Sequence, residues 1–166
     1  MRALIEQYRA LEIYGAEHQD QINKKQRKAQ GVVYTPVEAV DFQVRSANES
    51  TKEHYNGAEL KDPGVQLIDP FAGTGVYHVR AIQLGLLGEG EHLRDKILKD
   101  VFFSEIDPVA FSYAVSNITR AAKKAGAEIT EEEVAARGHC GDTFLLDDDD
   151  LVKYFPPGRW DEECTV

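Results

Sequence analysis

The segment that most constrains the fold is a short apolar run followed at once by a turn that contains two glycines. Residues 65–68 (Val-Gln-Leu-Ile) form the run, and residues 69–75 (Asp-Pro-Phe-Ala-Gly-Thr-Gly) form the turn. A short run bounded by turn residues is typical of a buried strand in a parallel sheet. Apolar residues then recur at helical spacing from Val76 to Leu86. Strand, tight turn and helix together form the unit from which parallel α/β sheets are built.

A second unit of the same kind follows along the chain. Residues 100–104 (Asp-Val-Phe-Phe-Ser) read as a strand, residues 105–108 as a turn, and Val109 to Ala125 as an alanine-rich helix. Thr130, followed by three glutamates, indicates a further helix start. A third, weaker strand covers Arg137 to Cys140. Successive units predict an α/β fold of the Rossmann-like, doubly wound type, with a partial parallel sheet flanked by helices.

The residues before the first strand predict helical structure and then a connection. Residues 1–30 carry an intermittent apolar stripe at helical spacing. Thr35 followed by Pro36 favours a helix start, with a capping oxygen and then proline at the first helical position. We therefore expect a helix over Val37 to Val44. Residues 46–63 contain turn signals and little periodicity, so we expect a connection there.

Composition limits the class of protein. The chain has 166 residues, of which 42% are hydrophobic, and this suffices for one domain with its own core. We divide it into a helical segment, residues 1–30, and a domain, residues 31–166. No apolar run has the length of a membrane span, no secretory signal is present, and only two cysteines occur. These features predict a protein of the reducing cytoplasm without membrane contact.

The charge pattern bears on partners and metals. A net charge of −10 works against binding of a phosphate backbone, so this chain alone should bind DNA weakly or not at all. The basic cluster at residues 24–28 is either a solvated helix face or a local phosphate contact. The acidic run Asp147 to Asp150 lacks the pattern of a calcium loop and is expected to be a solvated turn. His78 and His139 lack partners at metal-ligand spacing, so we expect structural roles.

The turn at residues 69–75 has the features of a small-molecule site. Gly73 and Gly75 permit sharp backbone torsions and close approach of a ligand, and the following helix start offers backbone N–H groups. The turn lacks both the Gly-x-Gly-x-x-Gly spacing of dinucleotide folds and the Lys-Ser or Lys-Thr of a P-loop. Asp69 would repel a pyrophosphate and attract an ammonium group. S-adenosylmethionine (SAM) carries such a group in its amino-acid moiety.

Acidic residues also end the next two predicted strands. Glu105 stands where a carboxylate can accept hydrogen bonds from both hydroxyls of a ribose, and its neighbour Ile106 can pack on an adenine face. At the third strand end, Asp142 can accept a hydrogen bond from the adenine amino group, with Phe144 as an aromatic neighbour. Each carboxylate either belongs to one shared cofactor site or merely caps the helix after it. Their order along the chain favours the shared site.

Four motifs occur in a fixed order: Gly-Val-Val-Tyr-Thr-Pro at 31–36, Asp-Pro-Phe-Ala-Gly-Thr-Gly at 69–75, Ser-Glu-Ile-Asp-Pro at 104–108 and Gly-Asp-Thr-Phe at 141–144. This set resembles the N6-adenine DNA methyltransferases. More narrowly, it is similar to the methylase region of type I, type IIG and type ISP restriction-modification enzymes. The resemblance covers residues 28–166, and its most specific part is the pairing of the first two motifs. It implies the class I SAM-dependent methyltransferase fold, with SAM as cofactor.

The resemblance also implies a role for each matching residue. The methionine end of SAM would be covered by Tyr34, Thr35 and Pro36. Its amino and carboxylate groups would be held by Asp69, Phe71, Ala72, Gly73, Thr74 and Gly75. The ribose would be held by Glu105, and the adenine would be surrounded by Ile106, Asp142 and Phe144.

One motif of the family is missing. In such enzymes the next strand ends in Asn-Pro-Pro-Tyr or Asn-Pro-Pro-Phe, which binds the extruded target adenine. No Asn-Pro-Pro occurs here, since Pro156-Pro157 follows Phe155, and residues 160–166 read as the strand that would lead to it. We therefore expect the SAM-binding portion of an adenine-specific DNA methyltransferase. It would have no catalytic residue of its own, be inactive alone, and contact DNA through the complete enzyme.

Two alternatives remain open. The chain can be a non-catalytic SAM-binding or partner-binding subunit that a second polypeptide completes. It can also be a fragment of an Asn-Pro-Pro methyltransferase that acts on protein glutamine or RNA, because such enzymes share the cofactor site. The upstream Tyr-Thr-Pro favours DNA, by analogy with the family.

Overall fold

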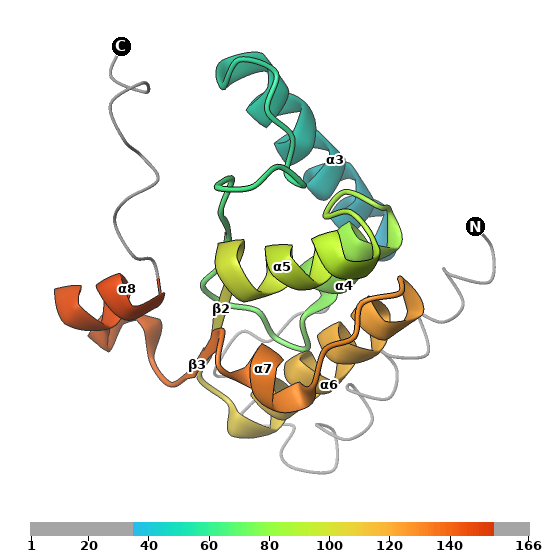
Figure 1. Cartoon of the computed structure of the whole chain (residues 1–166). Coiled ribbons are helices and arrows are strands. Elements are labelled where there is room, and N and C mark those ends of the chain that lie inside the picture. The colour runs from blue at the N-terminus through green and yellow to red at the C-terminus, as the bar shows by residue number, and fades with distance from the viewer. Residues whose placement is uncertain (1–34, 155–166) are drawn as a thin grey trace.

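The computed structural model describes residues 35–154, which form a three-stranded parallel sheet with helices packed against it (Figure 1). The strands are β1 (Leu67–Asp69), β2 (Val101–Glu105) and β3 (Gly138–Cys140), side by side in that order. In the register, Ile68 pairs with Phe102. The α/β prediction is confirmed, and every predicted strand occurs within two residues of its expected position.

The helices between the strands pack against one core. They are α4 (Val76–Gln83) and α5 (Gly90–Asp100) between β1 and β2, and α6 (Pro108–Lys124) and α7 (Glu131–Ala135) between β2 and β3. Connections between neighbouring parallel strands are right-handed, so successive helices fall on the same face of the sheet. In Figure 1, α5, α6 and α7 gather beside β2 and β3.

Two helix starts follow from local hydrogen bonds, of which only the one at Thr130 was predicted from the sequence. Before α6, the Asp107 side chain accepts hydrogen bonds from the N–H groups of Val109 (2.8 Å) and Ala110 (3.3 Å), and Pro108 occupies the first turn. Before α7, Thr130 and Glu133 form a capping box, in which each side chain accepts a hydrogen bond from the other residue's N–H. Both helix starts therefore depend on short polar side chains.

Helix α3 (Val37–His54) is much longer than expected, and the prediction of a connection from residue 46 is wrong. The apolar stripe of this helix ends at Val44, one turn before the next buried position, which is Asn48. The Asn48 side chain accepts a hydrogen bond from the Leu60 N–H at 3.0 Å. The buried amide of Asn48 thus continues the buried stripe of α3 where no apolar residue marks it. Its hydrogen bond to Leu60 holds the chain after α3 against the helix.

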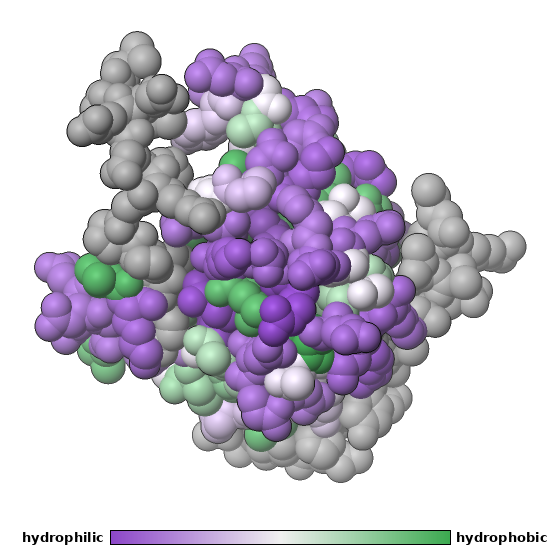
Figure 2. All heavy atoms as spheres, in the orientation of Figure 1, coloured by the Kyte–Doolittle hydropathy of each residue, from purple (hydrophilic) through white to green (hydrophobic). Residues whose placement is uncertain are grey.

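Helix α5 was not predicted from the sequence. Its buried positions are Leu93, Lys96, Ile97 and Asp100, so half of its buried stripe is charged. Periodicity of apolar residues is the main signal of an amphipathic helix, and here that signal is diluted. The outer surface of α5 is hydrophilic, as is most of α3 on the face shown in Figure 2.

Two further local predictions are corrected. Helix α3 begins at Val37, with Pro36 in an extended conformation (ψ 142°) as the capping residue rather than as the first helical residue. The acidic run is not a solvated turn, because residues 148–150 form the first turn of helix α8 (Asp148–Tyr154). The Asp147 side chain accepts a hydrogen bond from the Asp150 N–H at 2.8 Å. Carboxylates at a helix N-terminus are stabilised by its macrodipole.

Several sequence predictions lie outside the described residues. These are the helical segment of residues 1–30 with its basic cluster, Tyr34 of the first motif, and the expected strand at residues 160–166. Within residues 35–154, no helix combines the length and apolarity that crossing a membrane requires. In the same range, no group of three or more metal-ligating side chains is placed to hold an ion.

Candidate ligand-binding site at the strand ends

The carboxyl ends of the three strands meet at one place. The Glu105 carboxylate, at the end of β2, accepts a hydrogen bond from the Gly73 N–H in the glycine turn after β1, with Oε2 2.8 Å from the nitrogen. The Glu105 carbonyl oxygen accepts a hydrogen bond from the Gly141 N–H after β3 at 3.0 Å. Gly73, Glu105 and the residue before Asp142 are therefore brought together, as the sequence analysis expects of one shared site.

Gly73 and Gly75 serve different purposes in the turn. Both have positive φ, 55° and 79°, and residues other than glycine rarely adopt this backbone conformation. A Cβ at Gly75 would lie 3.2 Å from the Ala114 backbone and 3.3 Å from Ile118, because α6 packs closely there. A Cβ at Gly73 would meet no atom within 4 Å. Gly75 thus allows helix packing, and Gly73 leaves open space in front of the turn.

The side chains of Ala72 and Thr74 are buried and do not line that space. Ala72 is 3% exposed, and its N–H donates a hydrogen bond to the Ser104 carbonyl oxygen at 2.9 Å. Thr74 is 5% exposed, and its carbonyl oxygen accepts a hydrogen bond from the Asn117 side chain at 3.0 Å. These residues hold the turn against β2 and α6, and their side chains are not available to a ligand.

Glu105 makes two backbone hydrogen bonds in this structure. Oε2 accepts from the Gly73 N–H, and Oε1 accepts from the Asp107 N–H at 2.9 Å. The sequence predicts that the backbone N–H groups of the turn face a ligand, but the Gly73 N–H faces Glu105 instead. An ionised carboxylate has about four acceptor positions, so each Glu105 oxygen retains one for a ligand.

The two other carboxylates also have local partners. Asp69 Oδ1 accepts a hydrogen bond from the Phe71 N–H at 3.2 Å, while Oδ2 is buried and faces His78 Nδ1 at 3.9 Å. Asp142 Oδ1 accepts a hydrogen bond from the Phe144 N–H at 3.0 Å. Each carboxylate therefore stabilises its own turn as well as standing at the shared site. Asp69 can reach a ligand only through Oδ1.

A hydroxyl pair joins the third strand end to the first, and the sequence analysis missed it. The short 3-10 helix η1 (Thr143–Leu145) begins just after Asp142. The Thr143 hydroxyl donates to the Pro70 carbonyl oxygen at 2.8 Å and lies 2.7 Å from the Ser104 hydroxyl. Ser104 is fully buried at the end of β2. The available signal in the sequence was a serine at the end of the apolar run of β2, one residue before Glu105.

Apolar side chains project from this end of the sheet. Phe71, Ile106 and Phe144 are 65%, 61% and 83% exposed. The rings of Phe71 and Phe144 lie 5.7 Å apart with an interplanar angle of 42°. Exposed apolar groups beside convergent polar groups are typical of a site for a ligand with both characters. Leu145, next to Phe144 in η1, is 80% exposed and was not predicted.

Helix α3, which follows Thr35 and Pro36, is fixed against α4. The buried Arg80 side chain makes two hydrogen bonds to the Asp41 carboxylate, with nitrogen to oxygen distances of 2.6 and 2.7 Å. Tyr77 and Gln43 form a second link between the two helices. Because α4 begins at the glycine turn, these links set the position of α3 relative to the candidate site.

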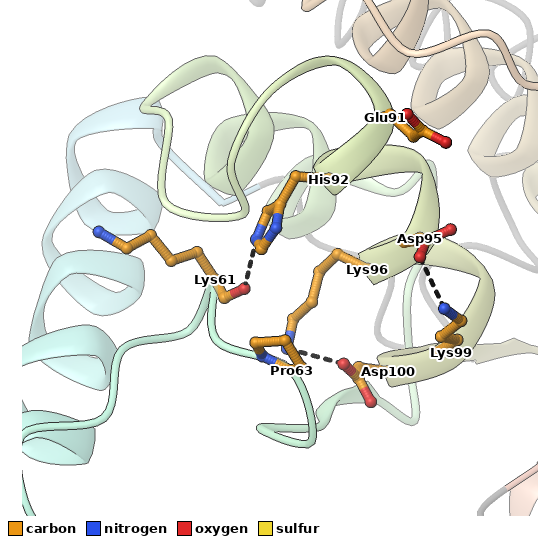
Figure 3. A pocket seen from close by; sticks show the side chains of 8 residues that line it. All are labelled: Lys61, Pro63, Glu91, His92, Asp95, Lys96, Lys99 and Asp100. Atoms are coloured by element: carbon orange, nitrogen blue, oxygen red, sulfur yellow. Dashed lines mark hydrogen bonds and ion pairs between the residues drawn. The ribbon is translucent and has the colours of Figure 1, made fainter.

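A hollow lies away from the strand ends, between α5 and the chain that leads to β1 (Figure 3). Inside it, the buried Lys96 ammonium donates to the carbonyl oxygens of Asp62 (2.7 Å) and Val65 and lies 3.3 Å from Asp100 Oδ2. On its rim, Lys99 is paired with Asp95 at 2.6 Å. The cations here are already engaged by the protein, which indicates a structural role for this region.

Comparison with known proteins finds relatives among solved structures. No protein-family model and no curated protein matches the sequence. A structure of DrdV in complex with DNA matches 83% of this chain, with a TM-score of 0.70 and 24% identity. The type ISP restriction-modification enzyme LlaGI, as a nuclease-deletion mutant with a DNA substrate mimic, matches 75% (TM-score 0.60, 26% identity). The ATP-dependent type ISP enzyme LlaBIII, bound to DNA, matches 72% (TM-score 0.58, 27% identity).

The chain spans only a small part of each of these proteins: 13% of the DrdV chain, 11% of LlaGI and 9% of LlaBIII. The likeness to DrdV supports the fold alone. The other two show that this chain is similar in structure to part of type ISP restriction-modification enzymes. The sequence resemblance to that group is confirmed at this coarser level.

Proposed function

We propose that this chain is the SAM-binding portion of an adenine-specific DNA methyltransferase of a restriction-modification system. The observation that carries the proposal is the hydrogen bond between Glu105 and the Gly73 N–H. It brings an acidic strand end and a glycine turn to one place, beside the exposed side chains of Phe71, Ile106 and Phe144. The similarity to part of LlaGI and LlaBIII supports the same assignment.

The residues at the strand ends fit the chemistry of SAM. The outward Asp69 Oδ1 suits its ammonium group, and the free acceptor positions of Glu105 suit the ribose hydroxyls. The adenine ring would pack on Ile106 and Phe144, within reach of Asp142. The carboxylates would favour a ligand that carries a positive sulfonium. Bound there, SAM would supply an already activated methyl group, which leaves positioning as the main task of the protein.

The chain would supply the methyl-donor site, and other parts of the enzyme would supply the target base. We assign no catalytic residue here, because the Asn-Pro-Pro motif is absent from the sequence. Within the described residues β1 forms an edge of the sheet, and Ile68 is half-exposed on it. We propose that further strands, from the rest of a longer enzyme or from a second polypeptide, complete the sheet beyond β1 and bring DNA to the site.

Calorimetric titration of the whole chain with SAM tests the proposal. We expect Glu105→Gln and Asp69→Ala to raise the dissociation constant at least ~10-fold, because hydrogen bonds to charged groups contribute about 1.5–3 kcal/mol each. Glu128→Gln is the matched control, since Glu128 is an exposed carboxylate away from the strand ends. Circular dichroism verifies that each variant is folded. Equal affinity of all three variants and the wild type would remove the cofactor assignment.

A further inference from the structure

Three buried polar atoms beneath the glycine turn have no hydrogen-bond partner within the described residues. They are Asp69 Oδ2 and both imidazole nitrogens of His78. Buried polar atoms are almost always hydrogen-bonded, and an exception calls for an explanation. Two of the three atoms face each other, because His78 Nδ1 lies 3.9 Å from Asp69 Oδ2. That distance is about an ångström longer than a charge-assisted hydrogen bond.

The surroundings of His78 direct its imidazole toward Asp69. His78 is 1% exposed in the first turn of α4, directly after the glycine turn. Its ring meets the Phe103 ring edge-on, with centroids 5.7 Å apart. The neighbouring core side chains of α4, Val79 and Ile82, are apolar. Asp69 is thus the acidic side chain available to this imidazole.

The protonation state follows from burial. Burial lowers the pKa of His78, against the opposing effects of the Asp69 carboxylate and the Phe102 backbone. A neutral imidazole carries one N–H and one acceptor nitrogen, and the hydrogen bond that it makes selects the tautomer. The Asp69 carboxylate and the Phe102 backbone both act as acceptors near this ring, and a carboxylate is the stronger acceptor, so the nitrogen that faces Asp69 should be the one that carries hydrogen.

We propose that His78 is a positioning residue of the candidate site: with its proton on Nδ1, it donates a hydrogen bond to Asp69 Oδ2. The contact closes by a small shift of the imidazole or the carboxylate. It fixes the carboxylate on its inner side, so that Oδ1 is held toward the strand ends. The assignment of the ligand as SAM rests on the proposed function, whereas the contact itself does not.

This role differs from that of a core histidine that merely fills space. Asp69 Oδ2 faces the interior, and Oδ1 accepts a hydrogen bond from the N–H of Phe71 in the turn. Oδ1 is therefore the oxygen that can also contact a ligand. Without a hydrogen-bond donor at the position of His78, the Asp69 carboxylate can rotate, and Oδ1 is then no longer held toward the strand ends. A donor at the position of Nδ1 is therefore the feature that matters, and variants can separate it from the volume of the ring.

Nitrogen-15 NMR of the histidine side chains in the full chain tests the contact directly. We expect His78 to be neutral with hydrogen on Nδ1, and its signals are identified by their loss in His78→Asn. A neutral ring with hydrogen on Nε2, or a charged ring at neutral pH, would overturn the proposal. This readout needs only the wild-type fold and no ligand.

SAM titrations of three variants test the effect on the site. The Asn amide nitrogen superimposes on Nδ1 and the Gln amide nitrogen on Nε2, whereas Leu has no donor. We expect His78→Leu and His78→Gln to weaken binding about tenfold and His78→Asn to retain most of it. Binding by His78→Leu as tight as that of the wild type would refute the positioning role. If the wild type shows the Nδ1 tautomer and binds no SAM, the proposed function fails and the contact stands.

Discussion

Glu105 supports the fold through both of its carboxylate oxygens and still has acceptor positions left over. Its two oxygens accept hydrogen bonds from Gly73 and Asp107, which shapes the turns after β1 and β2. Asp142 likewise caps η1 through the Phe144 N–H. The sequence left a choice between capping and cofactor binding for these carboxylates. The structure shows the local hydrogen bonds and the convergence together, so the two interpretations are compatible.

The two glycines of the turn should respond differently to alanine. Gly75→Ala should destabilise the fold by about 2–4 kcal/mol, since backbone strain and overpacking against α6 add. Gly73→Ala should cost about 1 kcal/mol, from its positive φ alone, yet weaken SAM binding by filling the open space. Urea denaturation and calorimetry measure the two effects. Gly85→Ala is the control, with φ 71° and open space at the far end of α4, and it should leave affinity unchanged.

Lys96 should be far more important for stability than its neighbour Lys99. Lys96→Met removes a buried ammonium and leaves Asp100 buried without its cation, so we expect a loss of about 3–5 kcal/mol. Lys99→Met removes only an exposed ion pair with Asp95, and the expected change is below about 1 kcal/mol. Chemical denaturation compares the two variants. Similar losses would show that Lys96 and its hydrogen-bond partners contribute no more to stability than an exposed ion pair does.

At the scale of elements, the strands and the glycine turn could be predicted, and the C-terminal part of α3 and all of α5 could not. Short apolar runs between turn residues indicate buried strands, because a strand in a parallel sheet is covered on both faces. In α3 the buried stripe continues through Asn48, and in α5 it includes Lys96 and Asp100. Their partners are distant in sequence: the Leu60 N–H and the carbonyls before β1. Local pattern cannot anticipate buried polar groups whose partners come from another segment.

The same limit applies to the candidate site. The sequence placed Asp69, Glu105 and Asp142 at strand ends, and their convergence follows from the topology. It did not reveal that Asp69 Oδ2 faces His78, or that Thr143 meets Pro70, because both contacts join separate elements. Side-chain direction in a turn depends on hydrogen bonds that form only when the elements pack.

The end of α3 should lose stability in acid through Glu59. Hydrogen bonds from Lys52 (2.8 Å) and Lys61 lower the pKa of Glu59 from 4.5 to about 2. A depressed pKa stabilises the fold above the unfolded value, and this contribution disappears as the pH falls from 4.5 through about 2. Melting temperatures of wild type and Glu59→Gln, compared across this range, isolate the effect. The difference should be largest above pH 4.5 and vanish only below about 2.

At the scale of the whole molecule, the described sheet has three strands, and the solved relatives are several times as long as this chain. β1 carries the glycine turn and lies at an edge. In doubly wound folds the ligand sits where the strand order reverses, between the first strand and its neighbour on the other side. If the proposed function holds, the SAM site would lie beside the edge of the described sheet at which further strands would join.

The chain alone should not bind duplex DNA measurably at physiological salt. Its net charge of −10 opposes association with phosphates, and affinity for DNA depends mainly on neutralising them. Fluorescence anisotropy with a labelled duplex measures this, and lowering the salt concentration should produce little gain. Tight, salt-sensitive binding would instead indicate a concentrated basic surface and would contradict the expectation that DNA is held by other parts of the enzyme.

The hydrogen bond from Gly73 to Glu105 also has a kinetic consequence. A loop that is already ordered before its ligand arrives loses little conformational entropy on association, and binding then requires no minor conformer to be populated first. The association rate should accordingly rise in proportion to ligand concentration without reaching a plateau. Weakening the hydrogen bond between Gly73 and Glu105 would lower the association rate even if every contact between protein and ligand were preserved.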